Sequence, residues 1–267
     1  MKRILVVWED KAFTQMALVV RRRMPARAPE DAMFPKVLFH TAAGNGKFAH
    51  YVGSTWTNVR GSGTPGDPGP IDHLVCVVDG DKLAQLLPKT VNRPDGSAPI
   101  GAWHQHAIDE WTSYLRASVD PSVDPLTVHG HVLRWSKESF ALAGYDRPSA
   151  ANCLGLDLAK PAVLAVLTAC KPDPRTILAA EFSDHFRSPL RCLEQLRAES
   201  GMAGTTKNAP EVDDCIKALA LAPDHLAVLC ARVPDVDRIV DLLWLLAAST
   251  PPLQTAPSAP AKRPKRR

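Results

Sequence analysis

The sequence predicts an α/β fold with a mainly parallel sheet flanked by helices and a largely helical C-terminal half. Short apolar runs rich in branched residues are typical of strands that are buried on both faces. In the first half these runs alternate with helical patterns, which favours a parallel sheet. After Ser139 almost every pattern has helical periodicity.

Length and composition set the domain organisation. A chain of 267 residues is long enough for one large domain or one domain with an appendage, and 45% apolar residues supply an ample core. We expect an α/β domain over residues 1–145 and a mostly helical part over 146–249, either separate or continuous with it. Residues 250–267, rich in proline, alanine, lysine and arginine, are expected to be a disordered basic tail.

The elements of the first half follow from periodicity and from their end signals. A helix is expected at 11–24, because its apolar positions recur at helical spacing, basic residues suit its last turn, and Pro25 ends it. The glycine- and proline-rich stretch 61–70 is expected to be a flexible loop. Further helices are expected at 82–87 and 102–117, and strands at 3–8, 36–41, 73–78 and 126–133.

The second half is predicted to be helical except for one short run. Helices are expected at 161–170, 188–200, 211–221 and 236–248, and one late strand at 226–230. The six cysteines are scattered without a CxxC pair, so neither a zinc ribbon nor a redox motif is indicated. We interpret most of them as reduced core residues.

The net charge of +4 is mild and comes largely from the C-terminal tail. The globular part is therefore close to neutral, which excludes a uniformly basic nucleic-acid-binding protein but leaves a local basic groove open. The tail either binds nucleic acid through its phosphates or is a solubilising end. Its basic residues are Lys262, Arg263, Lys265, Arg266 and Arg267.

Membrane insertion and secretion are not indicated by the sequence. No apolar run approaches the roughly 20 residues that a membrane span needs. The first apolar run ends at Glu9, so it does not have the form of a signal peptide. We therefore expect a cytoplasmic protein without a membrane partner.

Carboxylates stand at the ends of two predicted strands that are far apart in sequence. Glu9 follows the first apolar run, and Asp79-Gly80-Asp81 follows a later one. Ligands bind at the carboxyl ends of the strands in parallel sheets, and magnesium prefers oxygen ligands such as these. Gly80 would let the backbone bend so that both aspartates reach one ion. Asp-Gly-Asp is also an ordinary turn sequence.

This order of motifs resembles the Toprim (topoisomerase-primase) family over about residues 1–145. Glu9 matches the family's glutamate after the first strand, and Asp79 and Asp81 match its Asp-x-Asp. Glu138 resembles the extra acidic position of nuclease-type members and of standalone Toprim-like proteins from bacterial defence loci. The resemblance implies a nuclease that uses Mg²⁺ (or Mn²⁺), acts on nucleic acid in antiphage defence and works beside an ATPase partner.

The resemblance also implies a role for each acidic residue. Asp79 and Asp81 would be the main metal ligands, and Glu9 would hold a second ion or act as general base for water. Glu138 would assist the metal site, although it also suits the start of an exposed helix. Lys47, after a glycine turn at 44–46, either contacts a phosphate or is an ordinary surface lysine.

Two histidine pairs are candidates for other sites. His104 and His106 lie on a predicted helix, where positions i and i+2 do not face each other, so we interpret them as a solvated face. His129 and His131 lie on a predicted strand, where i and i+2 share one face. That pair either binds a transition metal or phosphate, or is a pair of hydrogen-bonded structural histidines, which we favour.

Two other functions compete with the nuclease. The sheet could be a catalytically inactive Toprim-like or flavodoxin-like scaffold that binds a protein partner through the helical half. It could also be a receiver-like regulatory domain, since Glu9-Asp10 resembles the acidic pair that follows the first strand of such domains. Asp79, the candidate phosphoacceptor, would then lie too far along the chain. The sequence has no GxxxxGK[ST] phosphate loop and no GxSxG elbow, so neither ATP hydrolysis nor a serine-elbow hydrolase is indicated.

Overall fold

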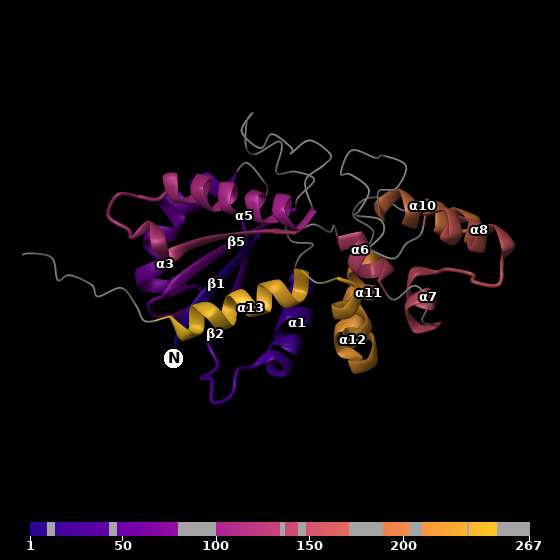
Figure 1. The fold of residues 1–267 in the computed structure, drawn as a ribbon, viewed down its shortest axis with the longest axis horizontal. Helices are drawn as coiled ribbons and strands as arrows, with labels where there is room; N and C mark the ends of the chain where they lie inside the picture. Colours follow the sequence, from indigo (N-terminus) through magenta and orange to yellow (C-terminus); the bar gives the residue numbers. More distant parts are fainter. Residues whose placement is uncertain are drawn as a thin grey trace, which may run out of the picture.

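A computed structural model describes residues 1–9, 14–42, 47–79, 100–133, 137–143, 148–170, 189–202, 210–233 and 235–249. Within these residues, four parallel strands form one sheet in the order β2-β1-β5-β6. The strands are β1 (Arg3–Trp8), β2 (Lys36–Thr41), β5 (His73–Asp79) and β6 (Val128–Leu133). The predicted α/β class with a helical second half is therefore confirmed (Figure 1).

Strand β1 lies in the interior of the sheet, between β2 and β5. It pairs in parallel with all of β2 on one side, and residues 4–8 pair with 73–77 on the other. The five side chains from Ile4 to Trp8 are at most 1% exposed. Burial on both faces explains why this strand is a continuous apolar run instead of an alternating one.

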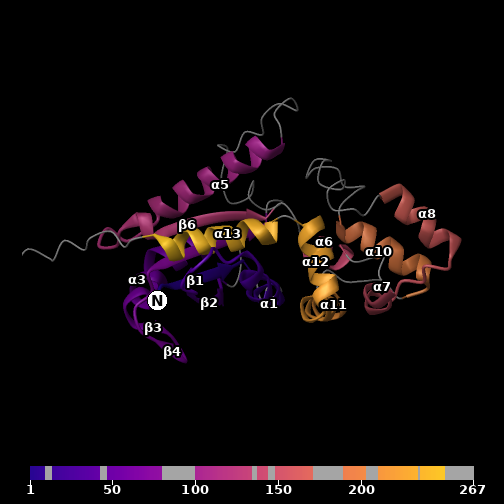
Figure 2. The same cartoon turned by 60° about the horizontal axis from the view of Figure 1, so that its bottom comes forward.

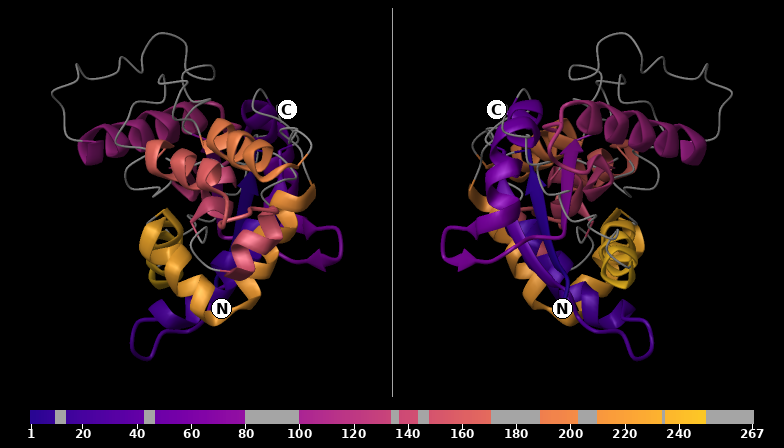
Figure 3. Two further views of the ribbon diagram at one scale, coloured as in Figure 1. Left: turned by 90° about the vertical axis from the view of Figure 1, so that its right-hand side faces the viewer. Right: turned by 90° about the vertical axis from the view of Figure 1, so that its left-hand side faces the viewer.

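Helices connect the strands, as the alternating pattern predicted. The helix after β1 ends at Arg23, before Pro25, and the chain continues as a short 3-10 turn. The stretch 61–70 is not only a loop, because it contains a two-stranded hairpin that projects from the body (Figures 2 and 3). The connecting elements are α1 (Thr14–Arg23), η2 (Met24–Arg27), α2 (Phe48–His50), the π-helical η4 (Tyr51–Thr55), α3 (Trp56–Ser62), β3 (Gly63–Thr64), β4 (Asp67–Pro68), α5 (Ile100–Ala117) and η5 (Pro125–Thr127).

Each face of the sheet packs into its own core. Leu5 and Val7 of β1 belong to the cluster with Trp111 of α5 and with the helices that follow β2. Ile4, Val6 and Trp8 belong to the other cluster, with α1 and the C-terminal helices. Figure 1 shows the two layers, with α5 over one face and α1 and α13 (Asp235–Ala248) over the other.

Side chains of α5 cover the outer edge of β6. An uncovered sheet edge presents unpaired backbone groups, which invite pairing with another chain. The helix can come this close because position 130 is glycine, and a Cβ there would lie 2.7 Å from Trp111. Three bonds cover the edge: Arg116 Nε donates to Val128 O (3.0 Å), Gly130 N donates to Thr112 Oγ1 (3.0 Å), and His104 Nε2 bonds to Val132 O (2.6 Å).

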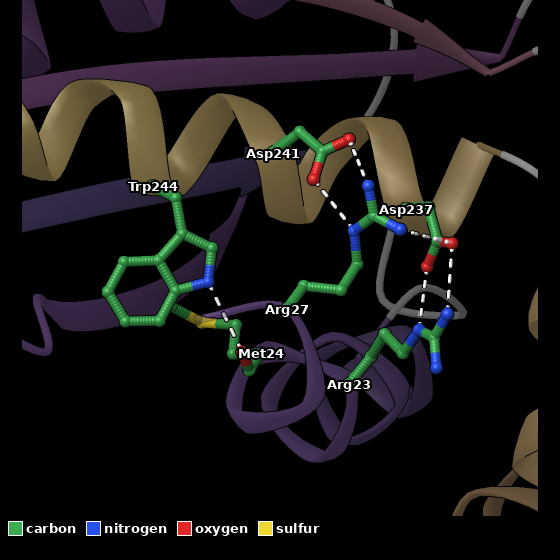
Figure 4. A network of polar contacts seen from close by, with 6 residues as sticks. All are labelled: Arg23, Met24, Arg27, Asp237, Asp241 and Trp244. Carbon is green, nitrogen blue, oxygen red and sulfur yellow. Dashed lines mark hydrogen bonds and ion pairs between the residues drawn. The ribbon is translucent and has the colours of Figure 1, made fainter. Parts of the chain in front are cut away.

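Helix α13 is attached to the N-terminal helix by a network of polar contacts (Figure 4). Asp237 accepts two bonds from Arg23, at 2.7 and 3.0 Å, and a third from Arg27 at 3.0 Å. Arg27 also forms a bidentate ion pair with Asp241, in which each of the two hydrogen bonds is 2.7 Å long. Covering the second face of the sheet therefore needs residues from both sides of the predicted boundary at 145.

The remaining helices lie beyond the carboxyl ends of the strands (Figures 1 and 2). The late strand predicted at 226–230 is wrong, because these residues are helical. Their apolar positions continue to Val233 at helical spacing and pack on the core, and Pro223 begins the helix. These helices are α6 (Lys137–Leu142), α7 (Pro148–Leu154), α8 (Pro161–Cys170), α10 (Pro189–Ser200), α11 (Pro210–Leu221) and α12 (Pro223–Arg232). None of the helices within the described ranges is both long and apolar enough to cross a bilayer.

Candidate functional site

The strand order marks one place on the sheet where a ligand is expected. From β1 the chain passes to β2 on one side and then returns to β5 on the other side of β1. The order therefore reverses between β1 and β5. In open parallel sheets, ligands bind outside the carboxyl ends of the strands at such a reversal.

Two of the predicted acidic residues lie at this point. Glu9 follows β1 directly, and Asp79 is the last residue of the neighbouring strand β5. Trp8 pairs with Val77, so Glu9 is level with the residue before Asp79. With adjacent strands about 4.8 Å apart and a rise of about 3.3 Å per residue, the two Cα atoms are roughly 6 Å apart. Glu9 and Asp79 thus occupy the same rim of the sheet.

The carboxylate of Glu9 is buried. Its side chain is 2% exposed, although the residue lies at the end of a strand. Burial lowers the local dielectric constant and strengthens the attraction between a carboxylate and a cation beside it. This environment suits a metal ligand better than an exposed turn would.

The other predicted ligands are described less completely. The structure gives backbone positions for Asp79 and for Glu138, the second residue of α6, but their side chains lie outside the described part. Asp81 lies wholly outside it. Among the described side chains, no group of three or more histidines, cysteines or carboxylates could hold a metal ion. Since Glu9 alone of the four predicted ligands has a described side chain, the magnesium site stays a prediction.

Of the predicted phosphate contacts, Lys47 alone lies within the described residues. Lys47 is exposed and immediately precedes α2, six residues after β2 ends at Thr41. Its contact with a phosphate remains a prediction. Three further predictions lie outside the described residues: the glycine turn at 44–46, the helix at 82–87, and the basic tail with Lys262, Arg263, Lys265, Arg266 and Arg267.

His104 corrects one sequence interpretation. We expected His104 and His106 on a solvated face, but His104 is 1% exposed, whereas His106 is exposed. His104 lies in phase with the buried residues of α5 at positions 107, 111 and 115, a signal that the sequence contains. Its Nε2 bonds to Val132 O, and its Nδ1 contacts the guanidinium of Arg238 on α13.

His131 joins this polar group from the sheet. It is 3% exposed and pairs with Val77, which in turn pairs with Trp8, so it lies one row inside the acidic rim. Its ring stands edge-on to that of His104, with centroids 6.1 Å apart. Arg238 has no sequence signal that links it to this group, because the contact spans 134 positions along the chain.

His129 lies in a different environment, at the amino-terminal end of the sheet. Its Nε2 bonds to His73 Nδ1 at 3.3 Å, and His73 Nε2 bonds to Ser249 Oγ at 3.2 Å. Ser249 donates to Leu246 O at 2.7 Å. Because that hydroxyl has one proton, the chain is satisfied when each Nε2 carries hydrogen and His73 Nδ1 accepts.

This arrangement keeps His129 neutral. Burial, followed by the nearby charges of His73 and Arg116, lowers the pKa of His129 to about 4. Burial likewise lowers the pKa of His73. The hydrogen bonds agree with the favoured interpretation of His129 as a structural histidine. His129 and His131 share a strand but have separate partners.

Comparisons with known proteins add no family assignment. No protein-family model, curated protein or solved structure matches this chain significantly.

Proposed function

We propose that the protein is a Mg²⁺-dependent nuclease of Toprim-like type that cleaves phosphodiester bonds of nucleic acid. The observation that carries the proposal is the position of Glu9 and Asp79. They end two adjacent central strands at the reversal point of a parallel sheet. The motif resemblance assigns function to the same two residues.

The donor set fits the proposed ion. Carboxylate oxygens are the ligands that Mg²⁺ prefers, and Mg²⁺ usually keeps several waters beside one or two carboxylates. Asp79 and Asp81 would hold the ion, with Glu138 assisting from the start of α6. When bound, the ion would polarise the phosphodiester and offset developing negative charge.

Glu9 would act on the attacking water in this proposal. Its carboxylate can accept a proton from water, or it can ligate a second ion. The helical half lies beyond the same rim and would shape the path of the substrate (Figure 1). Nucleic acid is thus the proposed partner. An ATPase partner and a role in antiphage defence are proposed from the resemblance, and a cytoplasmic location is proposed from the sequence pattern.

Plasmid nicking tests the proposal directly. Supercoiled plasmid is incubated with Mg²⁺ or Mn²⁺ and wild-type protein, Glu9→Gln or Asp79→Ala. A matched control is Asp109→Asn, which changes an exposed carboxylate on α5 outside the rim. We expect nicking by the wild type and the control, abolished by chelator and lost in both rim variants. Equal nicking by wild type and Asp79→Ala would remove the catalytic assignment.

Thermal unfolding separates the nuclease from the inactive scaffold. A ligand that binds only the native state raises the unfolding temperature. A nuclease with this site should gain stability from Mg²⁺ or Mn²⁺, and Asp79→Ala should gain less. A scaffold without the metal site should gain none in either form.

A further inference from the structure

The two edges of the sheet differ in how they are covered. Side chains of α5 cover the outer side of β6, through the bonds of Arg116, Thr112 and His104. Strand β2 is the other edge strand. Within the part of the chain that the structure describes, no further strand pairs with β2 on its outer side. Strand β2 therefore presents an open hydrogen-bonding edge.

The ladder between β2 and β1 shows which backbone groups face outward. The N–H groups of Lys36 and Ala42 each donate to a carbonyl of the β1 segment at 2.8 Å. Successive residues of a strand turn their backbone groups to opposite sides, so the even-numbered residues of β2 face β1. The N–H and C=O groups that face outward are those of Val37, Phe39 and Thr41.

These outward groups are complementary to a second copy of themselves. When another β2 lies antiparallel about a twofold axis at Phe39, this residue is opposite its own copy and Val37 is opposite Thr41. Opposite residues of a hydrogen-bonded antiparallel pair exchange both of their N–H···O bonds. This register satisfies every outward group of both strands, whereas a shift by two residues leaves a residue of each copy unpaired.

The strand lacks the features that usually prevent such pairing. Natural edge strands are protected by charged residues, by proline or by a bulge. Residues 37–41 contain no lysine, arginine, aspartate, glutamate, proline or glycine. The charge of Lys36, at the amino end of the strand, is compensated by Asp67, whose carboxylate accepts a hydrogen bond from Nζ at 2.8 Å. Two copies of this edge can therefore approach each other.

An aromatic side chain lies where the axis would pass. Phe39 stacks with Trp8 of β1, with ring centroids 6.5 Å apart. In the antiparallel pair the second Phe39 would follow at the cross-strand distance of about 5 Å, which continues the aromatic row into the other sheet. The guanidinium of Arg21 lies 4.8 Å from the centroid of the Phe39 ring. Arg21 is exposed, so water and salt screen the repulsion between its two copies.

The charges that flank β2 have opposite signs at its two ends. The charged residues in the six positions before the strand are Glu30 and Asp31, and the one in the six positions after it is Lys47. All three are exposed. An antiparallel pair brings the amino end of one strand to the carboxyl end of the other, so acidic and basic groups meet at both ends. This order of charges favours a second copy of the chain as the occupant of the edge.

We infer that β2 forms the interface of a homodimer, in which two sheets join antiparallel about Phe39 into one continuous sheet. Each copy contributes four strands, and the two rims that carry Glu9 point to opposite ends of the joined sheet. Because α5 covers β6, the assembly closes at two copies. The inference does not depend on the proposed nuclease, since it uses a different part of the sheet.

Sedimentation of the full chain tests the dimer. Analytical ultracentrifugation measures its mass at about 1 to 100 μM, where we expect the wild type to form a dimer. Val37→Pro keeps the ladder to β1, because the N–H of Val37 faces outward, but removes one interface bond on each side of the axis. It should raise the dimer dissociation constant at least about tenfold. A monomeric wild type, or a folded Val37→Pro that dimerises as tightly as the wild type, would overturn the inference.

Charged substitutions at Phe39 test the position of the axis. Phe39→Lys and Phe39→Glu each place like charges opposite each other and should weaken the dimer. An equal mixture of the two should form a heterodimer at least about threefold tighter than either alone. The matched control is Leu126→Lys, which adds a charge at an exposed apolar position before β6 and should leave the dimer unchanged. A mixture no tighter than the single variants would overturn the pairing about Phe39.

Amide hydrogen exchange examines the interface in the wild type without any substitution. The amides of Leu38 and His40 face β1 and should be protected at every protein concentration. Those of Val37, Phe39 and Thr41 should exchange at least about tenfold more slowly in the dimer than in the dilute monomer. Fast exchange of these three amides in the dimer would show that the two copies meet at another surface, and would overturn the inference.

Discussion

The hydrogen-bonded pair of His129 and His73 makes stability depend on pH in a predictable direction. The pKa of His129 is lowered to about 4 in the folded protein, against an ordinary value of about 6.5. Because the folded pKa lies below the unfolded one, the unfolded chain binds the proton more readily. The contribution to stability is therefore complete above about pH 6.5 and is lost as the pH falls toward 4.

The structure gives the magnitude of this loss. Between pH 7 and pH 5, a pKa of about 4 when folded and about 6.5 when unfolded reduces the free energy of unfolding by about 2 kcal/mol. The charged groups that face the pair are Lys2, Asp72 and Arg116. Lys2 and Arg116 disfavour protonation, and Asp72 favours it at His73.

His129→Gln isolates this contribution. The glutamine amide can donate to His73 Nδ1 in place of the ring Nε2, but it does not titrate. Urea unfolding at pH 7 and at pH 5 gives the free energy of unfolding of both proteins. We expect the wild type to lose about 2 kcal/mol more than His129→Gln over this interval. Equal losses in the two proteins would refute the account of His129 as a buried neutral histidine.

Two further predictions concern the packing of α5 and α13. Gly130→Ala should destabilise the protein by about 1 to 3 kcal/mol in urea unfolding, because its Cβ would lie 2.8 Å from Thr112 Oγ1; an unchanged midpoint would show that α5 does not need this approach. Asp237→Asn should cost about 1 kcal/mol at low salt, since it removes the carboxylate shared by Arg23 and Arg27. The cost should shrink in molar NaCl, and a loss independent of salt would contradict an ionic origin.

The sheet was predictable because its signals are local. The strands at 3–8 and 36–41 have the predicted bounds, and β5 extends one residue beyond the predicted apolar run, to Asp79. The helix at 100–117 was also found by its periodicity, at residues 102–117. The apolar run at 226–230 is too short to distinguish the periodicity of a strand from that of a helix. The apolar positions continue to Val233 at helical spacing, which indicates a helix.

The surroundings of the rim were less predictable because they depend on contacts between distant segments. Glu9 and Asp79 could be placed at one rim, since the ends of parallel strands meet there. The burial of His104 follows from the apolar stripe of α5, in which it lies in phase with the buried positions 107, 111 and 115. The contact of Arg238 with His104, and those of Asp237 with Arg23 and Arg27, join residues more than 130 positions apart.

Metal binding by the rim carboxylates tests the central claim most directly. Isothermal titration of Mn²⁺ into wild type, Glu9→Gln and Asp79→Asn measures affinity without any substrate, and unfolding without metal shows that each variant is folded. We predict a saturable site in the wild type that is weakened at least about tenfold in Asp79→Asn, with a smaller loss in Glu9→Gln. Folded variants that bind Mn²⁺ as tightly as the wild type would show that these strand ends do not form a metal site.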